Sequence, residues 1–554
     1  MSQTERDRPA EDAQTKPRAD ARALMSDMRA ADAASRHRPP NWWGVLVGVI
    51  AAGSGLAVGE FVAGLSRSWR SPVVSVGDRV IDHVPRALKN FAIRNFGTSD
   101  KVVLIWTILV VITITAAIVG IATVRGRRRV GVAFAVAFGV LGALAAGFGR
   151  NTHVSGIFPS LFAAATAAIV LLLGHHLAQP SAPSVMSRPR QATPAPPAPV
   201  VDRRRFLAAT GSLALGAVCV AVIGRNLQDR FNSQLERAGV RAPQPKKPLP
   251  APPADPAAIA GNDGLSPLIT PVRDFYRIDT ALAFPSVSLS SWKLHVTGLV
   301  DHELTLTYDD LLARELIERD VTISCVSNEV GGDLVGNARW VGCRLDDLLA
   351  EAGIKSGADQ VMGVSVDGFT AGFPVETLDG RDALIAIGMN GETLPVKNGF
   401  PARIIVPGIY GYVSAVKWLS EIRLTRFADE VGYWVPRGWA SIAPVKTQSR
   451  IDRPGGRIAT GTVPIAGVAW APTRGISKVE VQVDDGSWMP ATLGPSLGDN
   501  CWRQWWVPWD ATPGKHRIRV RATDGTGETQ PEARTDVAPD GATGWHTIRV
   551  TVSA

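Results

Sequence analysis

The pattern of hydrophobic and polar positions divides the chain into two parts. Up to about residue 225, apolar residues run together over about 20 positions at a time, the length of helix that crosses the hydrocarbon core of a bilayer. Beyond that point apolar and polar residues alternate in short runs separated by turn signals, which is typical of β-rich soluble domains. The first part therefore predicts an α-helical transmembrane bundle with five helices: Trp42–Leu65, Val102–Val124, Val130–Gly149, Val154–Gly174 and Phe206–Gly224.

Basic residues in short loops predict how these helices are oriented, because such loops stay on the cytoplasmic side. The segments Arg125–Arg129 and Arg203–Arg205 are the clearest markers. With five crossings, the N-terminus lies in the cytoplasm and everything after Arg225 lies outside. We therefore expect a multi-pass protein of the cell membrane, in contact with membrane lipid, whose C-terminal half is extracytoplasmic.

The loop 66–101 conflicts with this orientation, because it is expected outside and yet is rich in Lys and Arg, with Lys101 at its end. Its apolar positions between Val80 and Ala92 follow a helical pattern. This pattern predicts an amphipathic helix that lies on the membrane surface, which softens the conflict.

The second half begins with short elements that predict an α+β domain. Trp292–Gly298 and Leu304–Tyr308 alternate as strands, and Asp309–Glu315 is an expected helix with Asp at its start. Val321–Ser324 is a β-branched strand that runs directly into Cys325 and a polar, glycine-containing loop. A side chain at the end of a strand, on such a loop, occupies a position where functional residues are common.

From Ile442 the pattern changes to regular alternation with turns at intervals near ten residues. This spacing predicts a β-sandwich of about 110 residues. Its expected strands include Val463–Ala469, Val479–Val483, His516–Arg521 and Trp545–Val552.

The predicted organisation follows from these patterns and from segments rich in Pro, Ala and charge, which indicate tails and linkers. In order, it comprises a disordered cytoplasmic tail (1–40), four transmembrane helices (41–177), a cytoplasmic linker (178–205), the fifth helix (206–224), a second linker (225–260), the α+β domain (261–440) and the sandwich (441–554).

Charge and cysteine usage exclude several functions. The 59 Lys and Arg against 50 Asp and Glu give a net charge of +9, but much of the excess lies beside the predicted helices, so we expect no nucleic acid as a partner. The 4 cysteines are scattered and include no CxxC pair, which excludes structural zinc, c-type haem and an iron–sulfur cluster. Cys343 and Cys501 can either pair or pack as free thiols, and free thiols are the preferred interpretation.

Four blocks of the α+β domain are Thr322–Leu349, Met389–Pro395, Asn398–Gly408 and Gly411–Trp418. They resemble the cofactor core of the sulfite oxidase family of molybdopterin enzymes. The C-terminal blocks, such as Ser449–Asp452 and Trp502–Trp505, resemble the family's immunoglobulin-like dimerisation domain. The resemblance covers about residues 255–554 and not the membrane half.

This resemblance implies a molybdopterin cofactor whose molybdenum is bound by the thiolate of Cys325, which would be both the metal ligand and the catalytic residue. Ligand cysteines are deprotonated, and a bound cation stabilises the thiolate. Arginine and lysine suit pterin and phosphate binding because they donate to anionic oxygens. The implied cofactor-binding residues are Arg277, Asn328, Asp367, Asn398, Arg403, Ser414 and Lys417.

The sequence departs from the sulfite enzymes where substrate would bind. Those enzymes carry an arginine pair shortly after the cysteine, whereas this chain reads Asn328-Glu329-Val330. Asn398 stands where they carry a histidine. Because this positive charge is missing, the sequence does not decide whether the substrate is a sulfite-like anion, an S-oxide or an N-oxide. Tyr433, Trp434 and Arg437 either line the pocket or pack at the junction with the sandwich.

The sequence thus predicts a membrane-anchored molybdopterin oxidoreductase that transfers an oxygen atom and two electrons to or from a small-molecule substrate. We recognise no cytochrome module, so a separate electron-transfer partner, a cytochrome or a quinone, is expected, together with a homodimer formed by the sandwich. The alternative is a non-catalytic membrane-anchored surface protein that binds a partner through the sandwich. A further alternative makes the helices a transporter or a quinone-binding unit.

Overall fold

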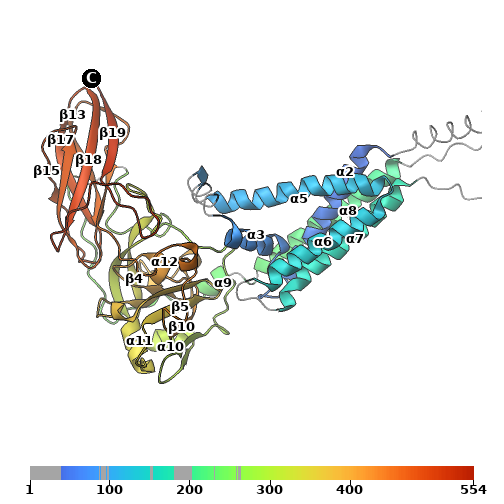
Figure 1. Ribbon diagram of the computed structural model, residues 1–554, viewed down its shortest axis with the longest axis horizontal. Helices are drawn as coiled ribbons and strands as arrows, with labels where there is room; N and C mark the ends of the chain where they lie inside the picture. Colours follow the sequence, from blue (N-terminus) through green and yellow to red (C-terminus); the bar gives the residue numbers. More distant parts are fainter. Residues whose placement is uncertain are drawn as a thin grey trace, which may run out of the picture. The chain divides into compact units, whose positions relative to one another are not determined.

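The computed structural model describes residues 39–85, 99–149, 154–179, 203–229, 233–257 and 264–554, together with residues 88, 91, 95–96, 231 and 259 (Figure 1). It divides into two compact units. The helical unit contains residues up to Gly77, Val102–Gly147 and Val154–Leu227, and the β-rich unit contains Asp78–Lys101 and Gln228–Ala554. Most of the predicted tail (1–40) and most of the predicted linker (178–205) lie outside the described residues.

The helical unit contains the apolar helices that the sequence predicts. Among the described residues, five helices are long and apolar enough to cross a membrane. Each predicted span is confirmed as a helix, with ends shifted by a few residues. The elements are α2 (Asn41–Ala63), α5 (Asp100–Val124), α6 (Arg128–Gly147), η2 (Val154–Ile157) with α7 (Phe158–Ala178), and α8 (Arg203–Asp229).

Small residues let the helices α2 and α5 pack closely. A Cβ atom on Gly48 would lie 1.9 Å from the carbonyl oxygen of Ala116, and one on Gly120 would lie 2.1 Å from that of Gly44. Larger side chains would force the two helices apart, and close approach of backbones is a common way for helices to associate in lipid.

The predicted amphipathic helix between α2 and α5 is present only in part among the described residues. The helix α3 (Pro72–His83) covers its beginning, and residues 86–87, 89–90, 92–94 and 97–98 lie outside the described residues. Asp82 and Lys101 belong to the β-rich unit and bond within it to Tyr433 and Asp279.

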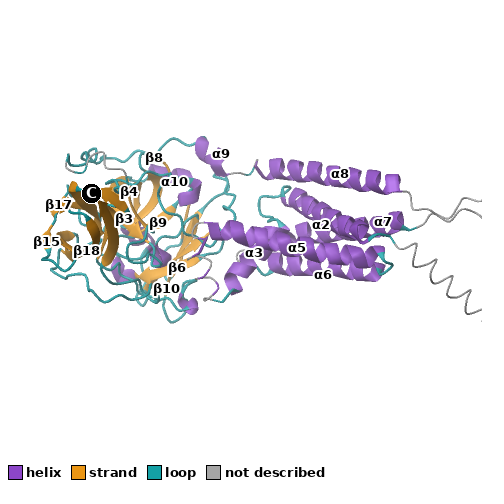
Figure 2. Cartoon of the chain, turned by 90° about the horizontal axis from the view of Figure 1, so that it is seen from above, coloured by secondary structure: helices purple, strands orange, loops and turns teal. Residues whose placement is uncertain are grey.

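The α+β domain of the second unit is built around two five-stranded sheets (Figure 2). One has the order β2-β1-β10-β5-β6, in which β1 and β10 run parallel with His295 opposite Glu421. The other has the order β3-β4-β7-β8, with β9 paired to β7. The strands are β1 (Leu294–Gly298), β2 (Leu304–Leu306), β3 (Ile317–Ser324), β4 (Val335–Arg344), β5 (Gln360–Ser365), β6 (Thr370–Pro374), β7 (Leu384–Met389), β8 (Glu392–Thr393), β9 (Arg403–Ile405) and β10 (Leu419–Thr425).

Short helices and turns complete this domain. The expected helix at 309–315 is α10 (Tyr308–Ala313), one residue earlier than predicted, because Thr307 rather than Asp309 caps it. The Thr307 side chain accepts from the backbone N–H of Asp310, and the Asp310 carboxylate accepts from the backbone of Thr307. The remaining helices are α9 (Ser233–Ala238), α11 (Leu345–Ala352), η3 (Val375–Thr377), η4 (Val396–Asn398), α12 (Gly411–Ser414) and η5 (Val435–Arg437).

The C-terminal strands form two sheets that share one apolar core. The sheet orders are β11-β13-β17-β16 and β12-β19-β18-β14-β15. Side chains from both, such as Trp505 and Val520, are fully buried together in that core. The strands are β11 (Gln448–Arg453), β12 (Arg457–Ala459), β13 (Gly461–Trp470), β14 (Ile476–Val483), β15 (Met489–Pro490), β16 (Thr492–Leu493), β17 (Arg503–Ala511), β18 (Gly514–Asp524) and β19 (His546–Ser553).

The α+β domain and the C-terminal sheets meet at a buried junction. Trp502 donates from its indole to the carbonyl of Leu268, and its backbone N–H donates to Thr322 Oγ1. Cys501 Sγ bonds to the carbonyl of Asp320, while Cys343 is buried in β4. All cysteines are free thiols, so Cys343 and Cys501 do not pair, as the sequence interpretation preferred.

Candidate active site

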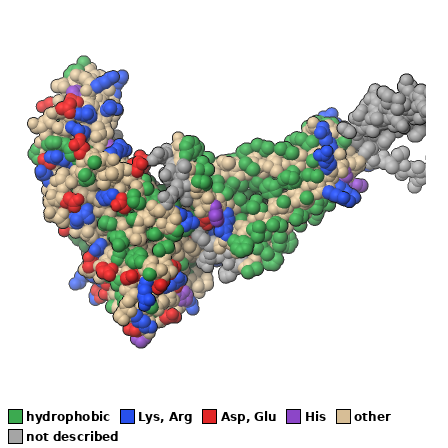
Figure 3. All heavy atoms as spheres, in the orientation of Figure 1, with side chains coloured by type: hydrophobic (Ala, Val, Ile, Leu, Met, Phe, Trp, Pro, Cys, Tyr) green, Lys and Arg blue, Asp and Glu red, His purple; other side chains and the backbone are tan. Residues whose placement is uncertain are grey.

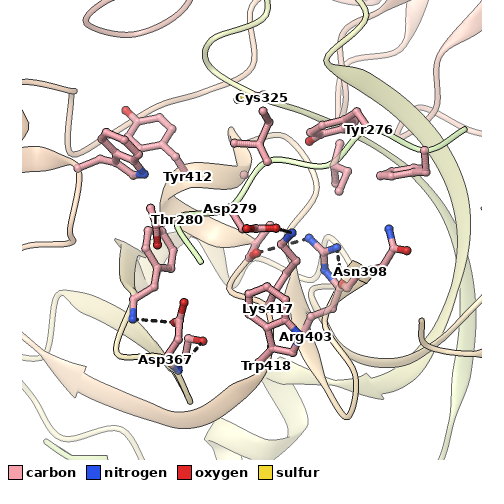
Figure 4. Close-up of a pocket in the computed structure, with 18 residues that line it drawn as sticks. Tyr276, Asp279, Thr280, Cys325, Asp367, Asn398, Arg403, Tyr412, Lys417 and Trp418 are labelled. Carbon is pink, nitrogen blue, oxygen red and sulfur yellow. Dashed lines mark hydrogen bonds and ion pairs between the residues drawn. The ribbon is translucent and has the colours of Figure 1, made fainter. Parts of the chain in front are cut away.

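A pocket of about 750 Å³ of empty space, partly open to solvent, lies in the α+β domain where strand ends and loops converge (Figure 4). Its walls come from the loop 275–280, the end of β3, the β5–β6 turn and the segment 398–418. Five of the sequence-predicted residues line it: Cys325, Asp367, Asn398, Arg403 and Lys417. Residues separated by almost 100 positions in sequence are thus brought together.

Cys325 lies immediately after β3, as predicted, and is 7 % exposed. Its backbone N–H donates to the carbonyl of Leu334, and its own carbonyl accepts from the N–H of Asn328. Burial raises the pKa of the thiol, with Ser327 and then Lys417 acting in the opposite direction. The thiolate therefore needs a bound cation to become the stable form.

Asn328 shapes the loop after Cys325 but does not line the pocket. Its Oδ1 accepts from the backbone N–H of Leu334 at 2.8 Å, which closes the loop on itself. Its Nδ2 is buried and has no hydrogen-bond partner in the described structure. A direct contact of Asn328 with the pterin therefore stays a prediction.

Arg403, at the start of β9, is a buried cation without a carboxylate partner among the bonds described for it. Its guanidinium donates to the carbonyls of Asn398 at 2.9 Å and Ala415 at 3.4 Å, and it lies 5.0 Å from the ring centroid of Trp340. Nε is buried and has no partner within the described structure. Burial lowers the pKa of Arg403 to about 10, so the side chain remains a cation at neutral pH.

Lys417 and Arg277 share the carboxylate of Asp279, which the sequence reasoning did not single out. Lys417 Nζ lies 2.8 Å from Asp279 Oδ2, and Arg277 Nε also lies 2.8 Å from that oxygen. Arg277 itself is not among the residues that line the pocket.

The electrostatics of this group follow from burial and close charges. Burial by itself would raise the pKa of Asp279, but Lys417, Lys101 and Arg277 together outweigh it and hold that pKa well below its ordinary value. Burial lowers the pKa of Lys417 to about 8, with Asp279 opposing the shift and Arg403 and Arg277 adding to it. Asp279 is therefore ionised at neutral pH.

A close turn brings these groups together. Gly399 has φ +120°, a conformation that L side chains rarely adopt, and a Cβ there would lie 3.1 Å from both Lys417 Cα and Arg403 Cβ. Only glycine fits this approach without strain.

The remaining predicted polar residues are buried but differ in position. Asp367 Oδ1 accepts from the N–H of Phe369 at 3.1 Å and lines the pocket. Asn398 also lines it, and its Oδ1 has no partner among the described residues. Ser414 donates to the carbonyl of Tyr410 at 3.1 Å and lies outside the lining, so its pterin contact stays a prediction.

Aromatic residues that the sequence did not identify also line the pocket. Tyr276 lies beside Cys325, whose proximity adds to the effect of burial in raising the pKa of the phenol (Figure 4). Tyr412 is the second residue of the short helix α12. Of the two alternatives for the segment after β10, pocket lining is correct for Trp434, whereas Tyr433 and Arg437 are not lining residues.

The loop that follows Cys325 rests on β11 and β19. Arg450 donates to the carbonyl of Gly332 at 2.7 Å and bonds to Asp452 at 2.6 Å. A Cβ on Gly331 would lie 2.3 Å from the ring of His546, whose Nδ1 accepts from the N–H of Ile451. The C-terminal sheets therefore take part in holding the loop that presents the cysteine.

His546 is expected to make the fold acid-sensitive. Burial, and then Arg450, lower its pKa from 6.5 to about 4. Between these values the unfolded chain binds more protons than the folded one, so stability falls as the pH decreases. We expect this residue to contribute a loss of about 2 kcal/mol between pH 8 and pH 5.

This loss is measured by urea unfolding of the full chain in detergent at both pH values, followed by tryptophan fluorescence. His546→Gln should reduce the difference, and the exposed His302→Gln is the control. An unchanged pH dependence in His546→Gln would contradict the assignment.

Comparisons with known proteins agree with this geometry. Residues 281–434 match the family model described as "Oxidoreductase molybdopterin binding domain". The chain is 28% identical over 330 residues to the mitochondrial sulfite oxidase of Homo sapiens, covering 49% of this chain and 60% of that protein. It is 34% identical over 151 residues to the uncharacterized oxidoreductase YuiH of Bacillus subtilis, covering 27% of this chain and 73% of that protein.

Among solved structures, the sulfane dehydrogenase SoxCD from Paracoccus pantotrophus matches with a TM-score of 0.47 and 24% identity, over 52% of this chain and 82% of that one. The chain spans about 60% of the length of the human sulfite oxidase that it matches. The molybdopterin-binding family model, together with 34% identity across 73% of the Bacillus protein, shows that this chain belongs to the sulfite oxidase family of molybdopterin-dependent oxidoreductases.

Proposed function

We propose that this chain is a membrane-anchored oxidoreductase that binds molybdopterin in the pocket, with Cys325 as the protein ligand of molybdenum. The observation that carries the proposal is the arrangement of Cys325 in one pocket with two cations, the buried Arg403 and Lys417, whose side chain is 11% exposed. Thiolate ligands suit such metal centres, and fixed cations suit an anionic cofactor.

Unpaired buried polar atoms support the presence of a polar ligand. Asn398 Oδ1 and Arg403 Nε are buried and have no partner in the described part of the chain. An unpaired buried polar group costs about 1–3 kcal/mol, so such groups normally have a partner. An acceptor and a charged donor beside one pocket fit a pterin, whose ring and phosphate offer both donors and acceptors.

Each residue has a distinct part in this proposal. Cys325 holds the metal, and the cations Arg277, Arg403 and Lys417 hold the pterin and its phosphate. Asp367, Asn398 and Ser414 orient the pterin ring, and Asn328 fixes the Cys325 loop. When bound, the cofactor supplies two-electron oxygen-atom transfer, while the protein supplies geometry and polarity.

The substrate end of the pocket favours a small molecule that accepts hydrogen bonds. Tyr276 beside Cys325 and Tyr412 are neutral at physiological pH, because burial raises the pKa of each phenol. The Tyr276 hydroxyl can therefore donate to a substrate oxygen, whereas the Tyr412 hydroxyl donates to the carbonyl of Ala440 at 2.6 Å and can only accept. The proposed substrates are sulfite-like anions, S-oxides or N-oxides, with electrons exchanged with a cytochrome or a quinone.

Metal analysis tests the function. Full-length protein purified from a host that makes the cofactor should contain molybdenum and pterin at about one per chain. A screen with a dye acceptor then detects oxidation of sulfite, and one with a dye donor detects reduction of S-oxides and N-oxides. Protein that folds in such a host without molybdenum would refute the proposal.

The surface of the helical unit supports membrane insertion. Along α5, Trp106, Val110, Ile114 and Ile118 form one exposed stripe, each 51–64% exposed. Figure 3 shows apolar side chains covering the visible face of this unit, with basic residues gathered at one end. Such a surface suits lipid and not water.

Contacts within each unit support the predicted orientation. Near the start of α2, Trp43 stacks on Phe206 at the start of α8, and Arg203 lies over Trp42, which brings basic and aromatic residues to one end. Along the described chain, four apolar helices lie between Lys101 and Asp279. In space, the side chains of these two residues are in contact. An even number of crossings returns the chain to the same side, which fits the predicted topology, in which both the loop 66–101 and the C-terminal half are outside.

Thiol labelling tests this orientation. An impermeant maleimide should label Asp485→Cys, in an exposed turn of the C-terminal sheets, on intact cells. Arg127→Cys, in the α5–α6 loop, should react only after permeabilisation. The reverse pattern would place the domain in the cytoplasm, and the unsubstituted chain controls for background labelling.

The C-terminal sheets are assigned as an immunoglobulin-like domain that forms a homodimer. The support is their two sheets around one core, antiparallel except for the parallel pair β12 and β19, and the sequence resemblance already described. The mass of the detergent-solubilised protein, measured by light scattering, tests the dimer.

A further inference from the structure

A further cationic side chain reaches Asp279 from a distant part of the chain. Lys101 is the second residue of α5, and its Nζ donates to Asp279 Oδ1 at 2.5 Å and to the carbonyl of Ala281 at 2.7 Å. Both residues belong to the β-rich unit. The Lys101 side chain is 20% exposed and that of Asp279 is 6% exposed, so salt screens this pair only weakly.

Charge around the pocket is unbalanced by this arrangement. Lys101, Arg277 and Lys417 share one carboxylate, that of Asp279. Arg403 bonds to carbonyl groups only, among the contacts described for it. Asp367 is the other carboxylate among the lining residues. The charges of the lining residues balance, with Arg403 and Lys417 against Asp279 and Asp367. Lys101 and Arg277, which contact Asp279 from outside the lining, add about two positive charges, and a bound anion would balance them.

The segment that carries Lys101 is fastened to the domain at further points. Asp82 accepts from the hydroxyl of Tyr433 at 2.7 Å, and Arg437 lies 3.6 Å over the Tyr433 ring. Tyr433 directly precedes the lining residue Trp434. Lys101 itself is held by its contacts at 279–281, and Asp82, earlier in the same unit, contacts the residue next to Trp434.

We propose that Lys101 completes the phosphate-binding part of the cofactor site, together with Arg277 and Lys417. This inference rests on the proposed function, and it adds a residue from outside the region that resembles the family. A phosphate monoester carries nearly two negative charges at neutral pH, which matches the local excess. The Lys101 ammonium has three N–H groups, of which two are used by Asp279 and Ala281.

The test uses full-length protein made in a host that cannot synthesise the cofactor, with inorganic phosphate as the probe. Binding is measured by titration and by the phosphate-dependent rise in melting temperature. Lys101→Gln keeps a hydrogen-bond donor but removes the charge, and it should weaken phosphate binding about tenfold. Lys101→Arg should bind nearly as well as the unsubstituted protein. Lys417→Gln should also lose affinity, whereas the exposed Lys246→Gln should not.

Pterin and molybdenum content per chain, measured in a host that makes the cofactor, gives the second readout. Lys101→Gln should retain less pterin than Lys246→Gln after gel filtration. Equal phosphate affinity in Lys101→Gln and the unsubstituted protein would overturn the proposal. The proposal would also be overturned if the unsubstituted protein did not bind phosphate. A chain that binds phosphate through Lys101 but never acquires molybdenum would refute the proposed function and leave the anion contact standing.

Discussion

Replacing Cys325 by serine is expected to reduce turnover by more than about a thousandfold, equivalent to about 4 kcal/mol of transition-state stabilisation. A serine hydroxyl is far less acidic than a thiol and is a harder ligand, so it is a poor substitute for a thiolate on molybdenum. Pterin binding should persist, because Arg403 and Lys417 contact the cofactor elsewhere in the pocket. The measurements are dye-linked turnover and the pterin and molybdenum content per chain.

Cys343→Ser provides the matched control. That thiol is 4% exposed, like Cys325, but does not line the pocket. The Cys343→Ser variant therefore measures the effect of a buried hydroxyl in place of a buried thiol, without any change in the pocket. Full turnover in Cys325→Ser, or equal losses in the two variants, would contradict a ligand role for Cys325.

The second large effect is expected from Arg403→Met, which should lower the bound cofactor about tenfold or more. Hydrogen bonds to charged groups contribute about 1.5–3 kcal/mol each, and Arg403 offers a buried Nε that has no protein partner in the described structure. Methionine fills similar space but cannot donate. The pterin released from purified protein measures the loss.

Stability of the cofactor-free protein separates this effect from misfolding. Removing a buried charge that has no carboxylate partner should leave the melting temperature unchanged or higher, because the guanidinium is costly to desolvate. Loss of cofactor with an intact melting temperature would support a binding role. Normal cofactor content in Arg403→Met would exclude one.

Much of the fold could be predicted because it depends on local pattern. Apolar runs identify α5 and α6 regardless of what they pack against, and β-branched alternation identifies β3 before Cys325. The helix α10 was expected one residue too late because two neighbouring residues, Thr307 and Asp309, can both cap a helix, and the geometry selects Thr307.

The site was predictable only where residues lie within recognisable blocks. Cys325, Arg403 and Lys417 lie in such blocks, and all three line one pocket. Tyr276 and Asp279 lie in an irregular stretch with no periodicity, so pattern alone gave no reason to select them. Their roles depend on contacts that sequence spacing does not encode.

Lys101 is the clearest example of this limit. Interpreted locally, it is one more basic residue in a loop that conflicts with the expected orientation. The structure pairs it with Asp279, 178 positions away.

The Lys101–Asp279 contact also sets an order for synthesis and assembly. Lys101 leaves the ribosome well before Asp279, and Cys325, Arg403 and Lys417 follow later still. No nascent chain that ends before Trp434 contains the complete pocket, and by then the helices α2 to α8 have all been made. Cofactor loading is therefore a late event, and a chain truncated before Lys417 lacks one of the cations proposed to hold the phosphate.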